Sequence, residues 1–120
     1  MELRHLRYFI AVAEELNFGR AADRLHVAKP TLSQQIKDLE DTLAVRLFER
    51  DTTRVRLTVP GEAFLAQARL LIDHADRAVA VAREAAQGRH GVLRIGNAAT
   101  LSHGFMPACL RTFRREYPGV

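Results

Sequence analysis

The segment 59–87 constrains the fold of this chain more than any other, because apolar residues recur along it at alternating spacings of three and four. This pattern is typical of one long helix with a single apolar stripe. At 1.5 Å per residue the helix would be about 40 Å long, which is more than a domain of this size can cover. We therefore predict a seam between two copies of the chain; the alternative is packing within one chain. The stripe consists of Leu65, Ala68, Ile72, Ala75, Val79, Ala82 and Ala86.

Three shorter helices are predicted before this segment. Apolar residues follow helical spacing from about Leu3 to Leu16, with Leu16 as the last residue of the buried stripe. Asn17 is suited to cap a short second helix that contains residues 20–25. Pro30 fits the first position of a third helix, because its fixed φ suits that place. The buried stripe of the third helix is expected at Leu32, Ile36, Leu39 and Leu43.

A small β-hairpin is predicted between the third helix and the long one. Two short alternating runs, Leu47–Arg50 and Val55–Leu57, flank the polar residues 51–54. Thr58 is placed to cap the long helix. Three helices followed by a hairpin form the winged helix-turn-helix pattern, which we assign to residues 1–58.

An incomplete second domain is expected after the long helix. Gly88–Gly91 ends that helix and is the candidate hinge. Val92–Gly96 predicts a buried strand, and the helix that follows carries Cys109 on its apolar stripe. One strand and one helix cannot complete a parallel sheet. Residues 92–120 are therefore expected to begin a larger α/β domain that is cut short.

The composition sets limits but does not identify a function. The chain carries 18 Lys and Arg against 14 Asp and Glu, a net charge of +4, yet residues 1–58 hold ten basic and nine acidic side chains. The placement of single charges must therefore carry any nucleic-acid argument. One cysteine excludes an intrachain disulfide and a cysteine zinc cluster. With no secretory leader and no apolar run near the roughly 20 residues of a membrane helix, a cytoplasmic location is expected.

The exposed face of the third helix carries the strongest functional pattern. Polar and basic side chains at its start are the donors and acceptors that read base edges when a recognition helix enters the DNA major groove. The acidic residues within 38–41 lie at the other end, and we expect them to pair with Arg46 or Arg50. The alternative is that the polar face is merely solvated. The predicted DNA contacts are Lys29, Pro30, Thr31, Ser33, Gln34 and Lys37.

Contacts to the DNA backbone are predicted beside this helix. Helix N-termini present backbone N–H groups and a partial positive charge, which suits phosphate near Asn17 and Thr31. Gly19 and Arg20, at the start of the second helix, are also predicted DNA contacts. Arg54 lies at the hairpin tip, where it would meet the minor groove or the flanking backbone. Arg56 is expected either to join it or to be a solvated partner of the acidic residues 49 and 51.

Several short runs, spread over almost sixty residues, carry a family resemblance: Leu3–Phe9, Asn17–Val27, Leu32–Ser33, Gln35–Ile36, Leu39–Glu40, Leu47–Arg50 and Leu57–Thr58. They resemble the N-terminal domain of LysR-type transcriptional regulators. The resemblance implies a bacterial regulator that binds an interrupted palindrome in double-stranded DNA as a homodimer or tetramer, with RNA polymerase as a further partner. It also implies that residues 59–87 are a dimerising linker helix.

The expected fold class is therefore mainly α: a winged helix-turn-helix with a long dimerisation helix, followed by the first β-α unit of a truncated α/β periplasmic-binding-like domain. The resemblance implies that this last domain, when complete, binds a small-molecule effector. Thr100 and Ser102 are its candidate effector contacts, although Ser102 also suits simple helix capping.

Four positions depart from the family pattern and affect specificity. Gly19 replaces a Ser or Thr whose hydroxyl often holds a phosphate in the family. Lys29 stands where the family favours Gln, and Gln34 stands where it favours Arg. On the wing, Thr53 replaces a frequent Arg, for which Arg54 is the nearest substitute. From the chemistry of base edges we predict that Lys29 contacts guanine and Gln34 contacts adenine.

No catalytic, metal or cofactor site is expected. The five histidines lack the spacing of metal ligands, and the sequence has no glycine-rich phosphate loop and no nucleophile elbow. Two alternatives to an effector-sensing regulator stay open. One is a truncated regulator that senses no effector, and the other is a winged-helix module that only dimerises.

Overall fold

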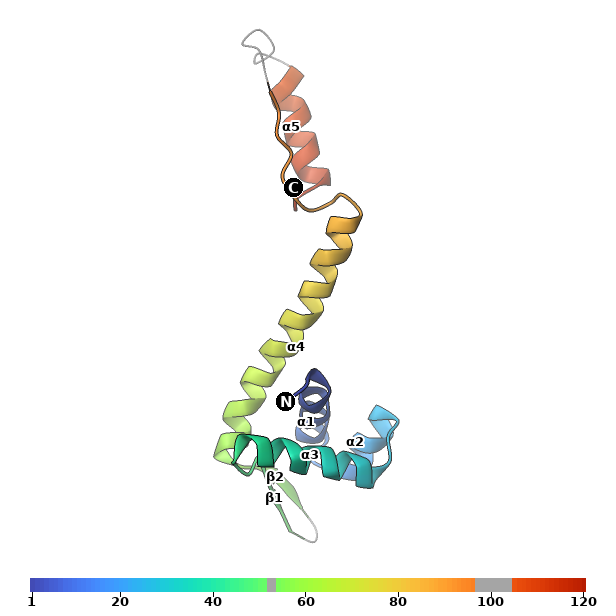
Figure 1. The fold of residues 1–120 in the computed structure, drawn as a ribbon, viewed down its shortest axis with the longest axis vertical. Helices are drawn as coiled ribbons and strands as arrows, with labels where there is room; N and C mark the ends of the chain where they lie inside the picture. Colours follow the sequence, from blue (N-terminus) through green and yellow to red (C-terminus); the bar gives the residue numbers. More distant parts are fainter. Residues whose placement is uncertain (52–53, 97–104) are drawn as a thin grey trace. The chain divides into compact units, whose positions relative to one another are not determined.

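The computed structural model describes residues 1–51, 54–96 and 105–120, and most of them are helical (Figure 1). The predicted Thr53, Thr100 and Ser102 lie outside these residues. The chain divides into two compact units, Met1–Ala75 and Asp76–Val120. In chain order the elements are α1 (Leu3–Glu15), α2 (Phe18–Leu25), α3 (Lys29–Leu43), β1 (Phe48–Arg50), β2 (Val55–Leu57), α4 (Val59–Ala86) and α5 (Phe105–Glu116).

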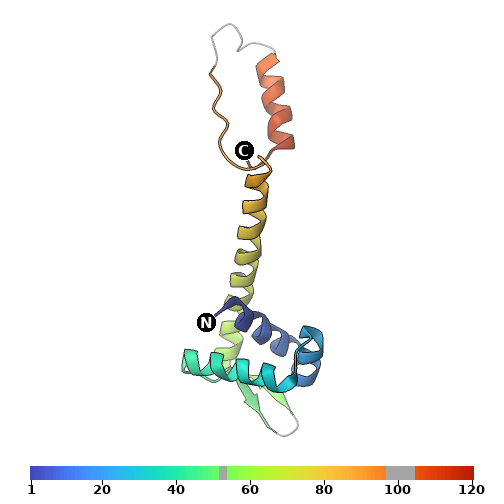
Figure 2. The same ribbon diagram turned by 45° about the vertical axis from the view of Figure 1, so that its right-hand side comes forward.

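In the first unit α1, α2 and α3 share one core, and the β1–β2 hairpin extends from the side of α3 (Figure 2). Phe9 is fully buried, and its ring centroid lies 5.4 Å from that of Phe48 on β1 and 5.1 Å from that of Phe64 on α4. These aromatic contacts join three elements around α1. The predicted stripe of α3 is confirmed, with Leu32, Ile36 and Leu39 buried and Leu43 half-buried against the core.

Local signals set the ends of the short helices. Leu16 adopts the left-handed conformation with φ 47° and is 47% exposed. It is therefore the C-cap of α1 and not the predicted end of the buried stripe, because the backbone reversal turns it off the helix face. Asn17 caps α2 as predicted, since its Oδ1 accepts a hydrogen bond from the Arg20 N–H at 2.9 Å. Helix α3 begins at Lys29, which puts Pro30 at its second position.

The hairpin and the start of α4 follow the sequence-based prediction. The strands are antiparallel, with Phe48 opposite Leu57. The Thr58 hydroxyl accepts a hydrogen bond from the Gly61 N–H at 3.0 Å and donates one to the Arg46 carbonyl oxygen at 2.6 Å. This cap fixes the start of a helix of 28 residues and ties it to the base of the hairpin.

The apolar stripe of α4 is divided between two environments. Ala68 is fully buried in the core of the first unit, and Leu65 and Ile72 are half-buried against that core. Ala68 is therefore covered by its own unit, as in the alternative of packing within one chain, whereas Leu65 and Ile72 are covered only in part. The rest of the stripe is less covered, with Ala75 half-buried and Val79, Ala82 and Ala86 exposed.

An ion-pair cluster at Glu14 ties α1 to α2 and to α4. One carboxylate oxygen of Glu14 lies 2.8 Å from the Arg24 guanidinium, and the other lies 3.1 Å from that of Arg69. The hydrogen bond from Arg24 is the main cause that lowers the pKa of Glu14. Partial burial opposes this effect, and the hydrogen bond from Arg69 adds to it.

We expect the Glu14 cluster to make stability depend on pH. Because the pKa of Glu14 is lower in the folded than in the unfolded chain, its contribution is present above the ordinary carboxyl pKa of 4.5 and is lost as the pH falls below it. Urea unfolding of the wild type and of Glu14→Gln measures this contribution. The wild type should be the more stable protein at neutral pH, and its advantage should shrink at about pH 3. An advantage of equal size at both pH values would contradict the expectation.

In the second unit the predicted strand is not formed. Helix α4 ends before Gly88 and Gly91, whose φ values are 69° and 140°, as predicted for a helix stop. Residues 92–96 are irregular, and Val92 is 84% exposed. A strand needs a neighbour for its backbone N–H and C=O groups. Among the described residues of this unit, the pairing found is one isolated bridge between His90 and Gly119.

Helix α5 is formed, but its apolar stripe is open to solvent. Phe105 is 74% exposed, and Cys109, which was predicted on a core stripe, is exposed as well. Phe113 and Tyr117 stack on each other with ring centroids 4.9 Å apart. The prediction of an apolar stripe on this helix is confirmed, but no described residue covers Cys109.

Candidate nucleic-acid interface

Helix α3 presents the predicted polar face away from the core. Its buried residues, among them Leu32 and Ile36, occupy the opposite side of the helix. Ser33 is half-buried. The other five predicted DNA contacts of this helix are exposed: Lys29, Pro30, Thr31, Gln34 and Lys37.

Gln34 is held along the helix axis by its neighbour one turn later. Its side-chain amide donates a hydrogen bond to Asp38 Oδ1 at 2.8 Å. Such pairs four residues apart are a normal feature of exposed helix faces. A contact between the Gln34 amide and a base would therefore replace an existing hydrogen bond.

A cleft lies between the N-terminal half of α3, the start of α2 and the hairpin. It brings together four of the predicted contacts: Gly19 from α2, Lys29 and Ser33 from α3, and Arg54 from the hairpin turn. Cationic side chains together with a helix N-terminus suit an anion. The lining residues are Leu16, Asn17, Phe18, Gly19, Lys29, Ser33, Arg50, Asp51, Arg54 and Val55.

The two predicted arginines of the wing differ in their surroundings. The backbone N–H of Arg54 donates to Asp51 Oδ1 at 2.7 Å, a bond that shapes the turn next to the cleft. Arg56 faces Glu49 across the hairpin. Residues directly opposite each other in an antiparallel pair have neighbouring side chains. Arg56 is therefore balanced by an acid, and Arg54 is the better placed of the two for an anion in the cleft.

Arg20, another predicted DNA contact, makes several contacts within the chain itself. Its backbone N–H is taken by the Asn17 cap. Its guanidinium donates to the Glu15 carbonyl oxygen at 2.7 Å and lies 3.4 Å from the Glu15 carboxylate. The backbone N–H and the guanidinium of Arg20 thus both contact the turn between α1 and α2, where the C-terminal carbonyls of α1 need partners.

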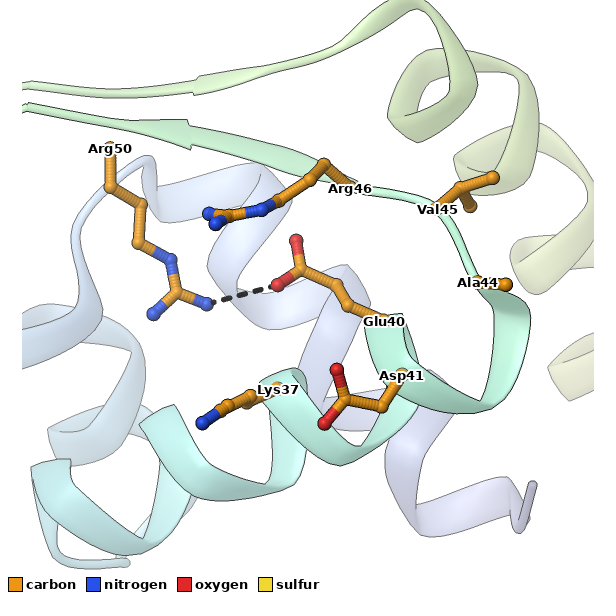
Figure 3. A pocket seen from close by; sticks show the side chains of 7 residues that line it. All are labelled: Lys37, Glu40, Asp41, Ala44, Val45, Arg46 and Arg50. Carbon is orange, nitrogen blue, oxygen red and sulfur yellow. Dashed lines mark ion pairs between the residues drawn. The ribbon is translucent and has the colours of Figure 1, made fainter.

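Glu40 is the important residue that the sequence pattern did not single out. It is 8% exposed, and its Oε1 accepts hydrogen bonds from the backbone N–H groups of Leu47 and Phe48 at 2.8 and 3.1 Å. Its Oε2 lies 3.5 Å from Arg50 Nη2, which confirms the predicted pairing of this acid (Figure 3). Its pairing with an arginine was predicted, whereas its burial and its two backbone hydrogen bonds were not; the sequence signal for burial is that Glu40 directly follows Leu39 of the buried stripe.

Two other kinds of site are absent from the described residues 1–51, 54–96 and 105–120. No group of three or more His, Cys, Asp or Glu in these ranges is placed to hold a metal ion. No helix in the same ranges is long and apolar enough to cross a membrane.

Proteins with similar sequences are transcriptional regulators. The HTH-type transcriptional regulator AlsR of Bacillus subtilis (strain 168) is 45% identical over 120 residues, and the alignment covers 100% of this chain. The Hca operon transcriptional activator HcaR of Escherichia coli (strain K12) is 45% identical over 118 residues, or 98% of this chain. The chain spans 40% of the length of each of these relatives.

Solved structures share the fold. CbnR, a LysR family transcriptional regulator, matches 99% of this chain and 41% of its own with a TM-score of 0.87 and 41% identity. The BenM DNA-binding domain in complex with catB site 1 DNA matches 72% of this chain and 97% of its own, with a TM-score of 0.69 and 45% identity. The family model of bacterial regulatory helix-turn-helix proteins matches residues 3–62. The chain therefore belongs to the lysR family of bacterial regulatory helix-turn-helix proteins.

Proposed function

We propose that this chain is the DNA-binding and dimerising part of a bacterial transcriptional regulator. The observation that carries the proposal is the exposed polar face of α3 beside a cleft bordered by Gly19, Lys29 and Arg54. The DNA complexes of the similar BenM and CbnR domains support it. In this proposal α3 enters the major groove and the hairpin lies beside it. Such a regulator acts on the chromosome in the bacterial cytoplasm, and we propose no catalytic role.

Fluorescence anisotropy on an interrupted palindrome tests the proposal. Each phosphate that a Lys or Arg neutralises releases counterions, so the logarithm of the association constant should fall linearly with the logarithm of the salt concentration. Absent binding, or binding that does not respond to salt, would contradict a DNA-binding function. Selection of bound sequences from a random DNA pool would then give the half-site sequence and spacing.

We propose Lys29 and Gln34 as the base readers, with Lys29 on guanine and Gln34 on adenine. Replacement of Gln34 by alanine should change the preferred base at one position of each half-site. A good bidentate contact is worth about 1–3 kcal/mol, so discrimination there should fall by roughly ten- to a hundredfold. The DNA sequences selected by Gln34→Ala are compared with those selected by Gln67→Ala, the control at an exposed glutamine on α4. An unchanged preference in Gln34→Ala would reject Gln34 as a base reader.

Gly19 offers a test of the phosphate cleft. A serine at this position would add a hydroxyl beside the N-terminus of α2, and affinity should rise by roughly two- to tenfold for all sequences alike. A Cβ at Gly19 would lie 3.2 Å from Asn17 Oδ1, so both serine and alanine require the same small adjustment. Gly19→Ala is therefore the control. Equal affinities of the two variants in anisotropy titrations would show that this position does not face a phosphate.

Self-association is proposed along the part of α4 that its own core leaves open. Leu71 is 43% exposed and Val79 is 48% exposed, and helical spacing puts both on one face. We propose a seam formed by Leu71, Ala75, Ala78, Val79 and Ala82. This seam keeps Ala75, Val79 and Ala82 of the predicted stripe. It leaves out Ala86, and it leaves out Leu65, Ala68 and Ile72 because their own core covers them wholly or in part.

We also propose a domain division for the regulator. It consists of a DNA-binding domain at 1–58, the linker helix at 59–87, a hinge at 88–91 and the start of an effector domain at 92–120. A tetramer and a small-molecule effector that contacts Thr100 and Ser102 belong to the same proposal.

A further inference from the structure

We propose that Glu40 and Arg50 position the wing against the recognition helix, so that DNA contacts from α3 and from the wing tip are made together. This inference rests on the proposed DNA-binding function. It concerns two charged residues that face the space between α3 and the hairpin. Neither is one of the predicted DNA contacts.

The wing needs an external support because of its size. Each strand has three residues, and the sheet has two strands. A two-stranded hairpin in water is marginally stable at best. Its position must therefore come from contacts between the hairpin and the helices. Phe48, buried at the base of β1, supplies one such contact through its ring, which packs against Phe9 and Phe18.

Glu40 supplies a polar contact at the same base. Its Oε1 accepts two backbone N–H groups at once, from Leu47 and Phe48 at 2.8 and 3.1 Å. Hydrogen bonds to a charged, buried acceptor are strong and leave large penalties when broken. Because both donors belong to the chain that enters β1, the strand cannot slide along α3 without losing both bonds.

Arg50 attaches the other end of β1. Its Nη2 lies 3.5 Å from Glu40 Oε2, and its guanidinium carbon lies 4.6 Å from the centroid of the Phe18 ring at the start of α2. The side chain is 33% exposed, which leaves its contacts only partly open to water. Asp51 follows directly and accepts the Arg54 N–H at 2.7 Å. A continuous series of contacts thus leads from Glu40 on the recognition helix to the wing tip.

The space around this pair is open. A cleft between α3 and the start of β1 surrounds it, and the side chains of Arg46 and Arg50 extend from the hairpin side toward Glu40 (Figure 3). Lys37 and Asp41 stand on neighbouring turns of α3 at the same cleft. With this open space beside it, the hairpin would have room to shift if the attachment at Glu40 were weakened.

A double-mutant cycle tests the inference. Glu40→Gln retains an oxygen that can accept the two backbone N–H groups but removes the charge that faces Arg50. Asp41→Asn is the matched control, because it makes the same change of charge one residue away, at an exposed carboxylate of the same cleft. Each variant is combined with Arg54→Ala at the wing tip, and DNA affinity is measured by anisotropy at a temperature where circular dichroism shows all variants folded.

In the wild-type background and in the Asp41→Asn background, the added Arg54→Ala substitution should weaken DNA binding roughly tenfold. In the Glu40→Gln background the same substitution should weaken it by less than about twofold. Arg50→Met should remove the coupling in the same way, and it decides the question if Glu40→Gln does not fold. The inference is overturned if Arg54→Ala lowers DNA affinity by the same factor in all backgrounds. It is also overturned if Arg54→Ala leaves the affinity of the wild type nearly unchanged. If the wild-type protein shows no salt-dependent DNA binding, the proposed function is overturned as well. If it binds DNA but Arg54→Ala has the same effect in all backgrounds, only the positioning role is overturned.

Discussion

Replacement of Gly61 by alanine should destabilise the first unit strongly, although helix propensity alone predicts a gain of up to about 1 kcal/mol. A Cβ at this position would collide with the Leu47 carbonyl oxygen and would lie 3.0 Å from Leu57 Cδ2. The carbonyl is not free to move, because it accepts the Thr58 N–H at 3.0 Å. The new Cβ would thus collide with backbone, and relief requires α4 to move away from the segment that leads into β1.

Overpacking of this kind costs about 1–3 kcal/mol and sometimes more, and we expect Gly61→Ala to reach or exceed the upper value. Typical domains have only about 5–15 kcal/mol of stability in total, so much of it would be lost. Urea unfolding measures the loss. Ala66→Gly, at an exposed position of the same helix, gives the propensity effect without a collision and should cost about 1 kcal/mol. A Gly61→Ala protein more stable than the wild type would show that α4 and β1 are not in close contact.

Aspartates at both Leu71 and Val79 should abolish self-association through α4. In the proposed seam a second copy of the helix covers the two side chains. Carboxylates at these positions would therefore lose their water without gaining partners. A penalty of about 3 kcal/mol or more corresponds to a rise of at least roughly a hundredfold in the dimer dissociation constant. Because both positions are exposed in the single chain, its helical content should stay unchanged.

Sedimentation equilibrium of Leu71→Asp with Val79→Asp measures the dissociation constant, and anisotropy on the full palindrome reports the accompanying loss of DNA affinity. The matched control is Ala66→Asp with Ala80→Asp. These alanines are exposed on the opposite side of α4 and add the same charge. If the dimers of both double variants dissociate, the effect comes from the added charge alone. A dimer that persists in Leu71→Asp with Val79→Asp would place the seam elsewhere.

The elements of the first unit were predictable because each has a local signal. Asn17 and Thr58 make the cap hydrogen bonds expected from their side chains, and the apolar spacing of α3 matches its buried face. Gly88 follows the end of α4, as glycines after helices commonly do. Caps and periodicity act over a few residues, so they can be read without knowledge of the fold.

The sites that required long-range contacts were predicted less well. The role of Glu40 depends on Leu47 and Phe48, which approach it only after the hairpin folds back on α3. The ion pair between Arg20 and Glu15 was not predicted, because it forms only when the turn between α1 and α2 brings the two side chains together. The apolar run 92–96 has the composition of a strand, but strand formation depends on a neighbouring strand and not on composition.

The stripe of α4 separates the two kinds of information most clearly. The sequence by itself determined that Val59–Ala86 forms one helix and which of its residues share a face, because helical periodicity is a property of the chain alone. Only the tertiary structure decided that Ala68 lies in the core of its own unit and that Val79 lies in solvent. Periodicity specifies the direction of a side chain around the helix, whereas burial depends on what lies in that direction.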